Sequence, residues 1–191
     1  MSGQPATAPG ERNGGRATGA DGAAPLVSVV MPAYNHEAYV AEAIASALGQ
    51  PIDLELVVVD DGSTDRTAEI VAAIDDPRIR LVRQANAGSH AAINRGIALA
   101  RGRYVSILNS DDRYVPGRLA ALTELAAGRA PKPTLAVTAV RLIDAQGAPL
   151  DEGSHPWLSM YREILEAWAV AEDTVDALLW GNFAVSTSNL F

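Results

Sequence analysis

Pairs of adjacent aspartates occur at three places in the sequence, Asp60-Asp61, Asp75-Asp76 and Asp111-Asp112. Two carboxylates in one short loop repel each other, and a bound cation, hydrogen-bond donors or solvent must offset that repulsion. One or two carboxylates cannot fill the octahedral coordination of Mg²⁺ or Mn²⁺, so such an ion takes its remaining ligands from water and substrate phosphates. The pairs therefore indicate either a divalent-metal site for a diphosphate-bearing substrate or aspartates that only cap turns and helices.

The elements around these pairs decide which of them can share a site. From residue 25 onward, apolar β-rich runs alternate with amphipathic segments, a pattern typical of a parallel sheet with crossover helices. Strands are expected at residues 26–31, 54–59, 79–82, 104–108, 134–142 and 184–191. Helices are expected at residues 37–48, 89–100, 116–127 and 174–180, and in a segment that reaches residue 74 from a cap at Ser63, Thr64 or Asp65. Pro32 is expected to end the first strand, and Gly102 to end the helix before it in a left-handed conformation.

Two of the three aspartate pairs are expected at one edge of the sheet. Asp60-Asp61, Asp111-Asp112 and residues 33–36 each follow a strand, so all three reach the carboxyl edge, where open α/β sheets bind ligands. Successive side chains of an extended segment point to opposite sides, so one member of each pair is expected to contact the ligand. Asp75-Asp76 precedes a proline and a strand, which predicts a solvated turn at the opposite edge. His36 lies just before a helix and is expected to face solvent.

The composition limits the classes of protein that fit. The 191 residues can bury one sizeable core, and we expect one domain over residues 25–191 after a disordered tail of residues 1–24. The formal net charge of -8 argues against nucleic-acid binding, which relies on clustered Lys and Arg. Cysteine is absent from the sequence, which excludes disulfides, thiolate metal sites and cysteine nucleophiles. No apolar run has the length of a membrane-spanning helix, and a cytoplasmic location is expected, with the inner face of the membrane as an alternative.

Four segments in this order resemble family 2 glycosyltransferases. They are residues 27–35 (VSVVMPAYN), residues 57–65 (VVVDDGSTD), Asn94-Arg95-Gly96 and residues 107–112 (ILNSDD). The resemblance is continuous over residues 25–125 and weaker over residues 181–190. It implies the GT-A fold, an α/β fold with a Rossmann-like, mostly parallel sheet flanked by helices. The acceptor-binding part that continues this fold in the family would be incomplete here.

The resemblance also implies roles in binding the sugar donor. Pro32, Ala33 and Tyr34 would line the nucleotide pocket, with Tyr34 beside the base. Asp61 would accept a hydrogen bond from a ring nitrogen of the base, which suits uracil or thymine. Asn94 belongs to the same donor-binding set.

The motif that ends at Asp112 would hold the metal. Asp112 is the expected ligand of Mn²⁺ or Mg²⁺, and Asp111 would contact the ribose or the sugar. Asn109 replaces an aspartate that is common in the family, so no anionic role is expected at this position.

A second departure from the family lies just before Asn94. Many relatives have an arginine, which helps to hold the donor, at the position of Ile93. His90 or Arg95 would then supply a cation for the donor, unless His90 only caps its helix or lies on the surface.

The implied reaction is displacement at the anomeric carbon of a nucleoside-diphosphate sugar, with UDP as the expected nucleotide. A hydroxyl of a glycan or glycolipid acceptor would attack with inversion, and the metal would act as a Lewis acid on the departing diphosphate. The general base that the reaction needs belongs, in relatives, to an acidic motif after the segment that matches residues 182–190. That base is expected beyond Phe191, so the chain is expected to bind donor more readily than it transfers sugar.

Two other interpretations stay open. A non-catalytic nucleotide-sugar-binding module would show metal-dependent donor binding without hydrolysis or transfer. A nucleotidyltransferase shares the architecture and the metal chemistry, but its glycine-rich basic loop after the first strand is here Pro32-Ala33-Tyr34-Asn35. A dinucleotide-dependent dehydrogenase and a nucleophile-elbow hydrolase do not fit, because their glycine-rich motifs are missing.

Overall fold

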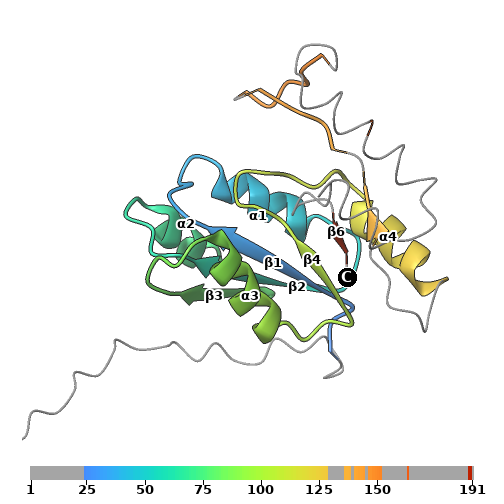
Figure 1. Ribbon diagram of the computed structural model, residues 1–191, viewed down its shortest axis with the longest axis horizontal. Helices are drawn as coiled ribbons and strands as arrows, with labels where there is room; N and C mark the ends of the chain where they lie inside the picture. Colours follow the sequence, from blue (N-terminus) through green and yellow to red (C-terminus); the bar gives the residue numbers. More distant parts are fainter. Residues whose placement is uncertain are drawn as a thin grey trace, which may run out of the picture. The chain divides into compact units, whose positions relative to one another are not determined.

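The computed structural model describes residues 24–128, 136–138, 140–144, 146–151, 163 and 189–190. The chain divides into two compact units, Met1–Ala121 and Leu122–Phe191. Strands and helices alternate through the first unit (Figure 1), in the order β1 (Val27–Ala33), α1 (Val40–Leu48), β2 (Leu54–Asp60), α2 (Thr67–Ala73), β3 (Ile79–Arg83), α3 (Ser89–Leu99) and β4 (Tyr104–Ile107). The remaining elements are α4 (Arg118–Ala127), β5 (Ala136–Val137) and β6 (Asn189–Leu190).

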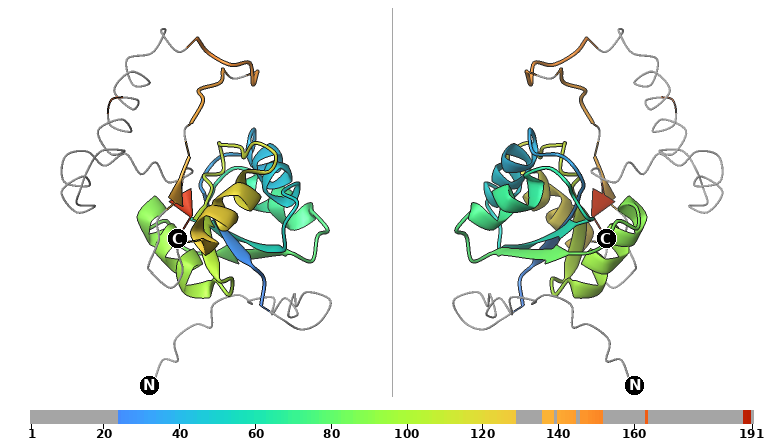
Figure 2. Two further views of the ribbon diagram at one scale, coloured as in Figure 1. Left: turned by 90° about the vertical axis from the view of Figure 1, so that its right-hand side faces the viewer. Right: turned by 90° about the vertical axis from the view of Figure 1, so that its left-hand side faces the viewer.

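The first unit is built on a parallel sheet in the order β3-β2-β1-β4. Parallel connections are right-handed, so the steps from β1 to β2 and on to β3 place α1 and α2 on one face of the sheet. The step from β3 back across to β4 places α3 on the other face (Figure 2). The chain changes direction across the sheet between β1 and β4, which is where open α/β sheets bind ligands. The predicted α/β fold, a parallel sheet flanked by helices, is confirmed.

Helices on both faces explain why β1 and β2 are buried along their whole length and mostly apolar. All seven residues of each strand are buried, as expected for a parallel sheet covered on both sides. The glycine of Asn94-Arg95-Gly96 lies where α3 crosses β1, and a Cβ at Gly96 would be 2.3 Å from Val30 Cγ1. Only glycine therefore allows α3 to pack this closely on the sheet.

Pro32 does not end the first strand, contrary to the prediction. It stays in register with β2, and β1 continues to Ala33. The carbonyl of Val30 accepts a hydrogen bond from Leu108, after β4, whereas the carbonyl of Ala33 accepts one from Asp61, after β2. Successive residues of β1 thus direct their backbone groups in turn toward β4 and toward β2. An N–H group at Pro32 would point toward β4, beyond the last residues that β1 and β4 pair. The strand tolerates proline there because the missing donor faces away from β2, so the β1–β2 ladder is kept.

Gly102 does not end α3 in a left-handed conformation, and this prediction is also wrong. α3 ends at Leu99, its C-cap Ala100 has extended dihedral angles, and Gly102 is not among the glycines with positive φ. Glycine is needed at this position for a different reason. A Cβ at Gly102 would lie 2.5 Å from the backbone nitrogen of Ser28, so only glycine lets the chain pass the start of β1 this closely.

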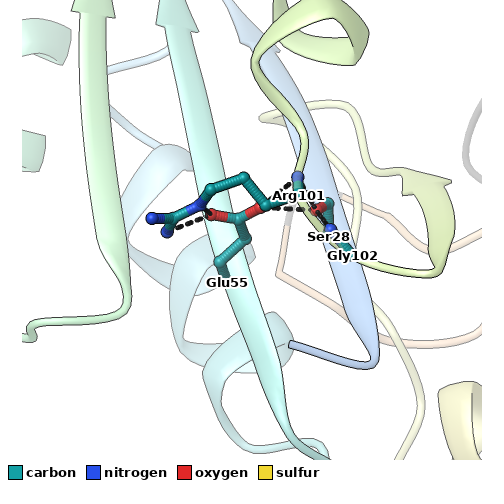
Figure 3. Close-up of polar contacts among 4 residues, drawn as sticks. All are labelled: Ser28, Glu55, Arg101 and Gly102. Carbon is teal, nitrogen blue, oxygen red and sulfur yellow. Dashed lines mark hydrogen bonds and ion pairs between the residues drawn. The ribbon is translucent and has the colours of Figure 1, made fainter. Parts of the chain in front are cut away.

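An ion pair between the buried carboxylate of Glu55 and the partly exposed side chain of Arg101 connects the amino ends of β1 and β2 with the segment before β4 (Figure 3). The carboxylate of Glu55 accepts hydrogen bonds from Ser28 Oγ at 2.6 Å, from the backbone nitrogen of Arg101 at 2.7 Å and from Arg101 Nε at 2.9 Å. Ser28 Oγ accepts in turn from the backbone nitrogens of Arg101 and Gly102, at 3.0 and 2.8 Å. Burial raises the pKa of Glu55, but the hydrogen bonds from Arg101 and Ser28 outweigh burial and hold this pKa below its ordinary value. The cluster lies at the edge of the sheet opposite to the predicted ligand site.

Parts of the elements predicted after residue 128 are described. β5 and β6 form an antiparallel pair, Ala136↔Leu190 and Val137↔Asn189, within the strands predicted at residues 134–142 and 184–191. The predicted tail, apart from Ala24, and the predicted helix at residues 174–180 lie outside the described residues. Among the described residues, no helix combines the length and the hydropathy needed to cross a membrane.

Candidate functional site

Three loops leave the carboxyl edge of the parallel sheet. The first loop, residues 34–39, connects β1 to α1, and the second loop, residues 61–66, connects β2 to α2. The third loop, residues 108–117, follows β4. Side-chain hydrogen bonds link these loops to one another, with the first loop in the middle.

Asn35 joins the first loop to the second. Its Oδ1 accepts a hydrogen bond from the backbone nitrogen of Thr64 at 2.8 Å, and its own backbone nitrogen donates to Ser63 Oγ at 3.1 Å. Asn35 has a φ of 53°, in the left-handed region that asparagine tolerates better than most residues. The asparagine therefore turns the chain out of β1 and binds the second loop at the same time.

Asp65 holds the first loop and also starts α2. One carboxylate oxygen accepts a hydrogen bond from the backbone nitrogen of Glu37 at 3.0 Å, and the other accepts from the backbone nitrogen of Thr67 at 2.9 Å. Of the three predicted caps, Asp65 is thus the residue that bonds the first turn of α2. α1 begins at Val40 rather than at residue 37 as predicted, and residues 37–39 form a turn before it.

His36 joins the first loop to α2 and to the third loop. Its backbone nitrogen donates to Thr67 Oγ1 at 2.8 Å, and its ring Nδ1 lies 2.7 Å from Ser110 Oγ. Its Nε2 lies 3.9 Å from Asp111 Oδ2. The side chain is only 32% exposed, so the expectation that His36 faces solvent is wrong. Sequence patterns do not identify this contact, because only the pairing of β1 with β4 brings the two segments together.

The two aspartates of the third loop are held differently. Asp112 Oδ2 accepts a hydrogen bond from Asn109 Nδ2 at 3.2 Å, and the backbone nitrogen of Asp112 donates to the carbonyl of Asn109 at 3.1 Å. Asp111 has a half-exposed side chain that faces His36. Asn109, which replaces an acidic residue common in the family, therefore acts as a hydrogen-bond donor that offsets part of the charge of Asp112.

A buried tyrosine anchors the third loop to β4. Tyr114 Oη donates to the carbonyl of Ile107 at 2.9 Å and lies 2.8 Å from Ser106 Oγ. The guanidinium carbon of Arg118 lies 4.4 Å from the centre of the Tyr114 ring. Burial raises the pKa of Tyr114 to about 12, so the phenol keeps its proton at neutral pH. Sequence reasoning missed this anchor, since the partners of the hydroxyl group come together only when the loop folds back on its strand.

Asp61 is buried and accepts three hydrogen bonds from the segment before α3. Gln84 Nε2 and the backbone nitrogen of Ala87 donate to Oδ1 at 2.7 and 2.9 Å, and the backbone nitrogen of Gly88 donates to Oδ2 at 2.8 Å. Burial raises the pKa of Asp61, but these hydrogen bonds outweigh burial and hold the pKa below its ordinary value. An ionised carboxylate has about four lone-pair positions, so Asp61 keeps capacity for one further donor.

Arg95 reaches the surroundings of Asp61 through Gln84. Arg95 Nη1 lies 3.4 Å from Gln84 Oε1, and the other end of the Gln84 amide is bonded to Asp61. His90 and Asn94 are exposed on α3. Sequence reasoning missed Gln84, which follows β3 and carries no motif signal, although it orients the carboxylate that the sequence predicts to bind the base.

The other predicted donor-binding residues lie at the carboxyl end of β1. Pro32 and Ala33 are buried, and the carbonyl of Ala33 accepts a hydrogen bond from the backbone nitrogen of Asp61 at 2.8 Å. Tyr34 is 45% exposed. Tyr34 is therefore accessible at this edge of the sheet, whereas Pro32 and Ala33 belong to its buried part.

The Asp75-Asp76 pair lies in the turn before β3, at the opposite edge, as predicted. Asp75 is exposed. Asp76 binds Arg78 through both carboxylate oxygens, at 3.0 and 2.8 Å. The hydrogen bonds from Arg78 lower the pKa of Asp76, so this carboxylate stabilises a turn.

The acidic residues of the third loop fit a divalent cation that brings part of its own ligand shell. In the part of the chain that the structure describes, no group of three or more His, Asp or Glu side chains is placed to hold a metal ion. Asp111 and Asp112 nevertheless supply carboxylate oxygens, the ligands that Mg²⁺ and Mn²⁺ prefer. This donor set suits a cation whose other ligands are water and a substrate diphosphate.

Comparisons with known proteins identify the family of this chain. The family model described as Glycosyl transferase family 2 matches residues 28–166. The succinoglycan biosynthesis protein ExoO of Rhizobium meliloti is 47% identical over 104 residues, which cover 53% of this chain and 30% of the relative. The chondroitin synthase of Escherichia coli is 44% identical over 95 residues, covering 48% of this chain and 14% of the relative. The matched segment thus spans less than a third of either relative.

Solved structures show the same fold. The mannosyltransferase PcManGT from Pyrobaculum calidifontis, in complex with GDP-Man and Mn²⁺, is 28% identical with a TM-score of 0.56, covering 62% of this chain and 36% of that protein. TarS of S. aureus is 30% identical with a TM-score of 0.50, covering 53% of this chain and 19% of that protein. Together with the parallel sheet and the motif loops at its carboxyl edge, these matches show that this chain has the GT-A fold and belongs to glycosyl transferase family 2.

Proposed function

We propose that this chain binds a nucleoside-diphosphate sugar with a divalent cation and presents the sugar to an acceptor hydroxyl, which displaces the nucleotide with inversion. The observation that carries this function is the assembly of the three loops at the carboxyl edge. Asp61 lies on the β2 side of β1, and Asp111 and Asp112 lie on the β4 side. Family membership and the GDP-Man and Mn²⁺ held by PcManGT support the same class of donor.

Asp61 is the proposed contact of the base. The carboxylate is ionised and already oriented by Gln84, Ala87 and Gly88. Its remaining lone pair can accept a hydrogen bond from a ring N–H, which uracil and thymine present, and UDP is therefore the proposed nucleotide. The exposed ring of Tyr34 would pack against the base, with Pro32 and Ala33 below.

The third loop is the proposed diphosphate and metal side of the site. Asp112 would bind Mn²⁺ or Mg²⁺, and Asp111 would contact the ribose or the sugar. When bound, the cation supplies Lewis-acid stabilisation of the charge on the departing diphosphate. Asn94 and His90 on α3 remain candidate donor contacts, and Arg95 would act on the base contact through Gln84.

The proposed acceptor is a hydroxyl group of a glycan or glycolipid. The names of two relatives, a succinoglycan biosynthesis protein and a chondroitin synthase, support a role in polysaccharide or glycoconjugate synthesis. We place the enzyme in the cytoplasm, with contact to the inner face of the membrane where a lipid-linked acceptor is used, and assign the donor site to a domain over residues 25–191.

Calorimetric titration of the chain with UDP, dTDP and GDP, each with and without MnCl₂, tests the function. We expect UDP to bind in a Mn²⁺-dependent manner, and Asp112→Asn to remove most of the Mn²⁺ dependence. Asp75→Asn is the matched control, because it neutralises the exposed member of the aspartate pair at the opposite edge. Equal binding with and without Mn²⁺, or equal losses in the two variants, would contradict the assignment of the third loop.

A further inference from the structure

His36 lies in the first loop, which follows β1, and its ring contacts the third loop, which follows the neighbouring strand β4. Its backbone nitrogen is bonded to Thr67 Oγ1 at 2.8 Å, which fixes the position of the residue against α2. Its ring Nδ1 is bonded to Ser110 Oγ at 2.7 Å, and its Nε2 is 3.9 Å from Asp111 Oδ2. One residue thus connects the segment that follows β1 with the paired aspartates that follow β4.

The ring of His36 has little freedom to leave this position. Tyr39 packs against it edge to face, with the ring centres 6.2 Å apart. Ser110 is 1% exposed, and a buried hydroxyl group that loses its partner is destabilised by desolvation. Among the described residues, the partner of Ser110 Oγ is the His36 ring. The imidazole therefore satisfies a buried group and cannot move without leaving it unpaired.

The third loop is consequently held from two sides. Tyr114 fixes the end that leads to α4 by binding the carbonyl of Ile107. His36 fixes the aspartate-bearing part by binding Ser110 and facing Asp111. Between these two attachments lies Asp112, whose carboxylate is oriented by Asn109. A loop attached at both sides presents its carboxylates in one arrangement before any ligand arrives.

From this geometry we infer that His36 is a positioning residue for donor binding: it preassembles the Asp111-Asp112 loop for the cation and diphosphate. The inference rests on the proposed function and concerns the affinity of the site. A site that is ordered in advance binds more tightly because the cost of ordering is not met at the moment of binding. Loss of the His36 ring should therefore weaken cation-dependent nucleotide binding while Asp61, on the other side of β1, still contacts the base.

Two substitutions of His36 and one control separate positioning from general stability. His36→Ala removes the ring, whereas His36→Asn keeps a polar group near the position of Nδ1 that can bond Ser110. Ser63→Ala is the control, because it removes a hydrogen bond between the first and second loops and leaves the third loop untouched. Each variant is titrated with UDP at saturating MnCl₂, with MnCl₂ at fixed UDP, and with UDP alone. Amide hydrogen exchange of residues 109–112 is measured without ligand.

We expect His36→Ala to weaken Mn²⁺-dependent UDP binding about tenfold, with a smaller effect on binding of UDP alone. It should also speed amide exchange at residues 109–112, whereas His36→Asn should stay within about threefold of the parent chain in affinity. Ser63→Ala should leave both the Mn²⁺ dependence and the exchange of residues 109–112 unchanged.

The exchange measurement keeps the inference testable apart from the function. If the parent chain binds no nucleotide with Mn²⁺, the proposed function fails, and unchanged exchange in His36→Ala would overturn the link to the third loop separately. If the parent chain binds UDP with Mn²⁺ and His36→Ala binds it equally well, the positioning role is wrong and the proposed function stands. Equal losses in His36→Ala and Ser63→Ala would also overturn the inference, since they would indicate general loosening of the loops.

Discussion

Arg101 Nε lies 2.9 Å from the carboxylate of Glu55. This charged side chain is only 3% exposed, because Glu55 is the second residue of the central strand β2. Arg101 comes just before β4, the strand that crosses to the far side of β1. The pair therefore attaches the segment before β4 to β2, across the start of β1 (Figure 3). Because strands are rigid, a contact at the amino edge of the sheet also determines where the third loop emerges at the carboxyl edge.

Glu55→Gln is expected to lower the free energy of unfolding by about 2 kcal/mol. The substitution leaves a partly buried guanidinium without its counter-charge, and the partial exposure of Arg101 keeps the cost below that of a fully buried pair. Urea denaturation followed by circular dichroism measures the change. Asp76→Asn, which breaks the more exposed Asp76–Arg78 pair, should cost clearly less. Equal losses of unfolding free energy in the two variants would show that the burial of Glu55 adds nothing to the stability of the chain.

The stability of the chain should fall in acid. Glu55 and Asp61 both have a pKa below the ordinary value in the folded state, so the unfolded chain binds more protons at acidic pH. Their contribution is complete above the unfolded pKa values, about 4.3 for Glu and 3.9 for Asp. It is lost as pH falls through the lower folded values. Urea midpoints measured at a series of pH values should decrease below about pH 5, with a shallower decrease in Glu55→Gln. An identical slope in that variant would contradict the role of Glu55.

Gly102→Ala should destabilise the fold by about 3 kcal/mol, because the added Cβ would meet the backbone of Ser28 at 2.5 Å and backbone cannot move aside cheaply. Gly117→Ala is the matched comparison. Gly117 has a φ of 77°, and an added Cβ there would meet no atom within 4 Å, so its cost should be the conformational strain alone, about 1 kcal/mol. Thermal unfolding of both variants measures the difference. A cost for Gly102→Ala no greater than for Gly117→Ala would contradict the close approach to β1.

Asn109→Asp should make the third loop less stable in the absence of a cation and should make it bind a divalent cation more tightly. The variant replaces the amide that donates to Asp112 with a second carboxylate, which repels Asp112 until a divalent ion is bound. The apparent dissociation constant for Mn²⁺ in the presence of UDP should fall about fivefold, as measured by calorimetry. Asn109→Ala removes the same hydrogen bond without adding charge and should not tighten Mn²⁺ binding. If Asn109→Ala raised the affinity for Mn²⁺ as much as Asn109→Asp does, the added charge would not be the cause of the tighter binding.

The site was partly predictable because strand ends can be located from local patterns. Alternating apolar runs and amphipathic segments predicted β1 to β4 and α1 to α3 to within a few residues. The rule that ligands bind at the carboxyl edge selected the pairs Asp60-Asp61 and Asp111-Asp112. The errors occurred where the outcome depends on a neighbour far away in the sequence. Pro32 stays in β1 because its missing N–H points past the end of the β1–β4 pairing, and Gly102 is needed because β1 passes beside it.

The sequence by itself determined the order of elements, the burial of β1 and β2 and the edge to which each aspartate pair belongs, since these follow from residue types within a few positions of one another. Only the tertiary structure decided that His36 bonds Ser110 and that Gln84 orients Asp61. Those contacts join segments that follow different strands. The first exists because the parallel sheet pairs β1 with β4, and the second because it pairs β2 with β3. A polar side chain in a loop bonds whatever the fold brings within about 3 Å, and no local pattern specifies that partner.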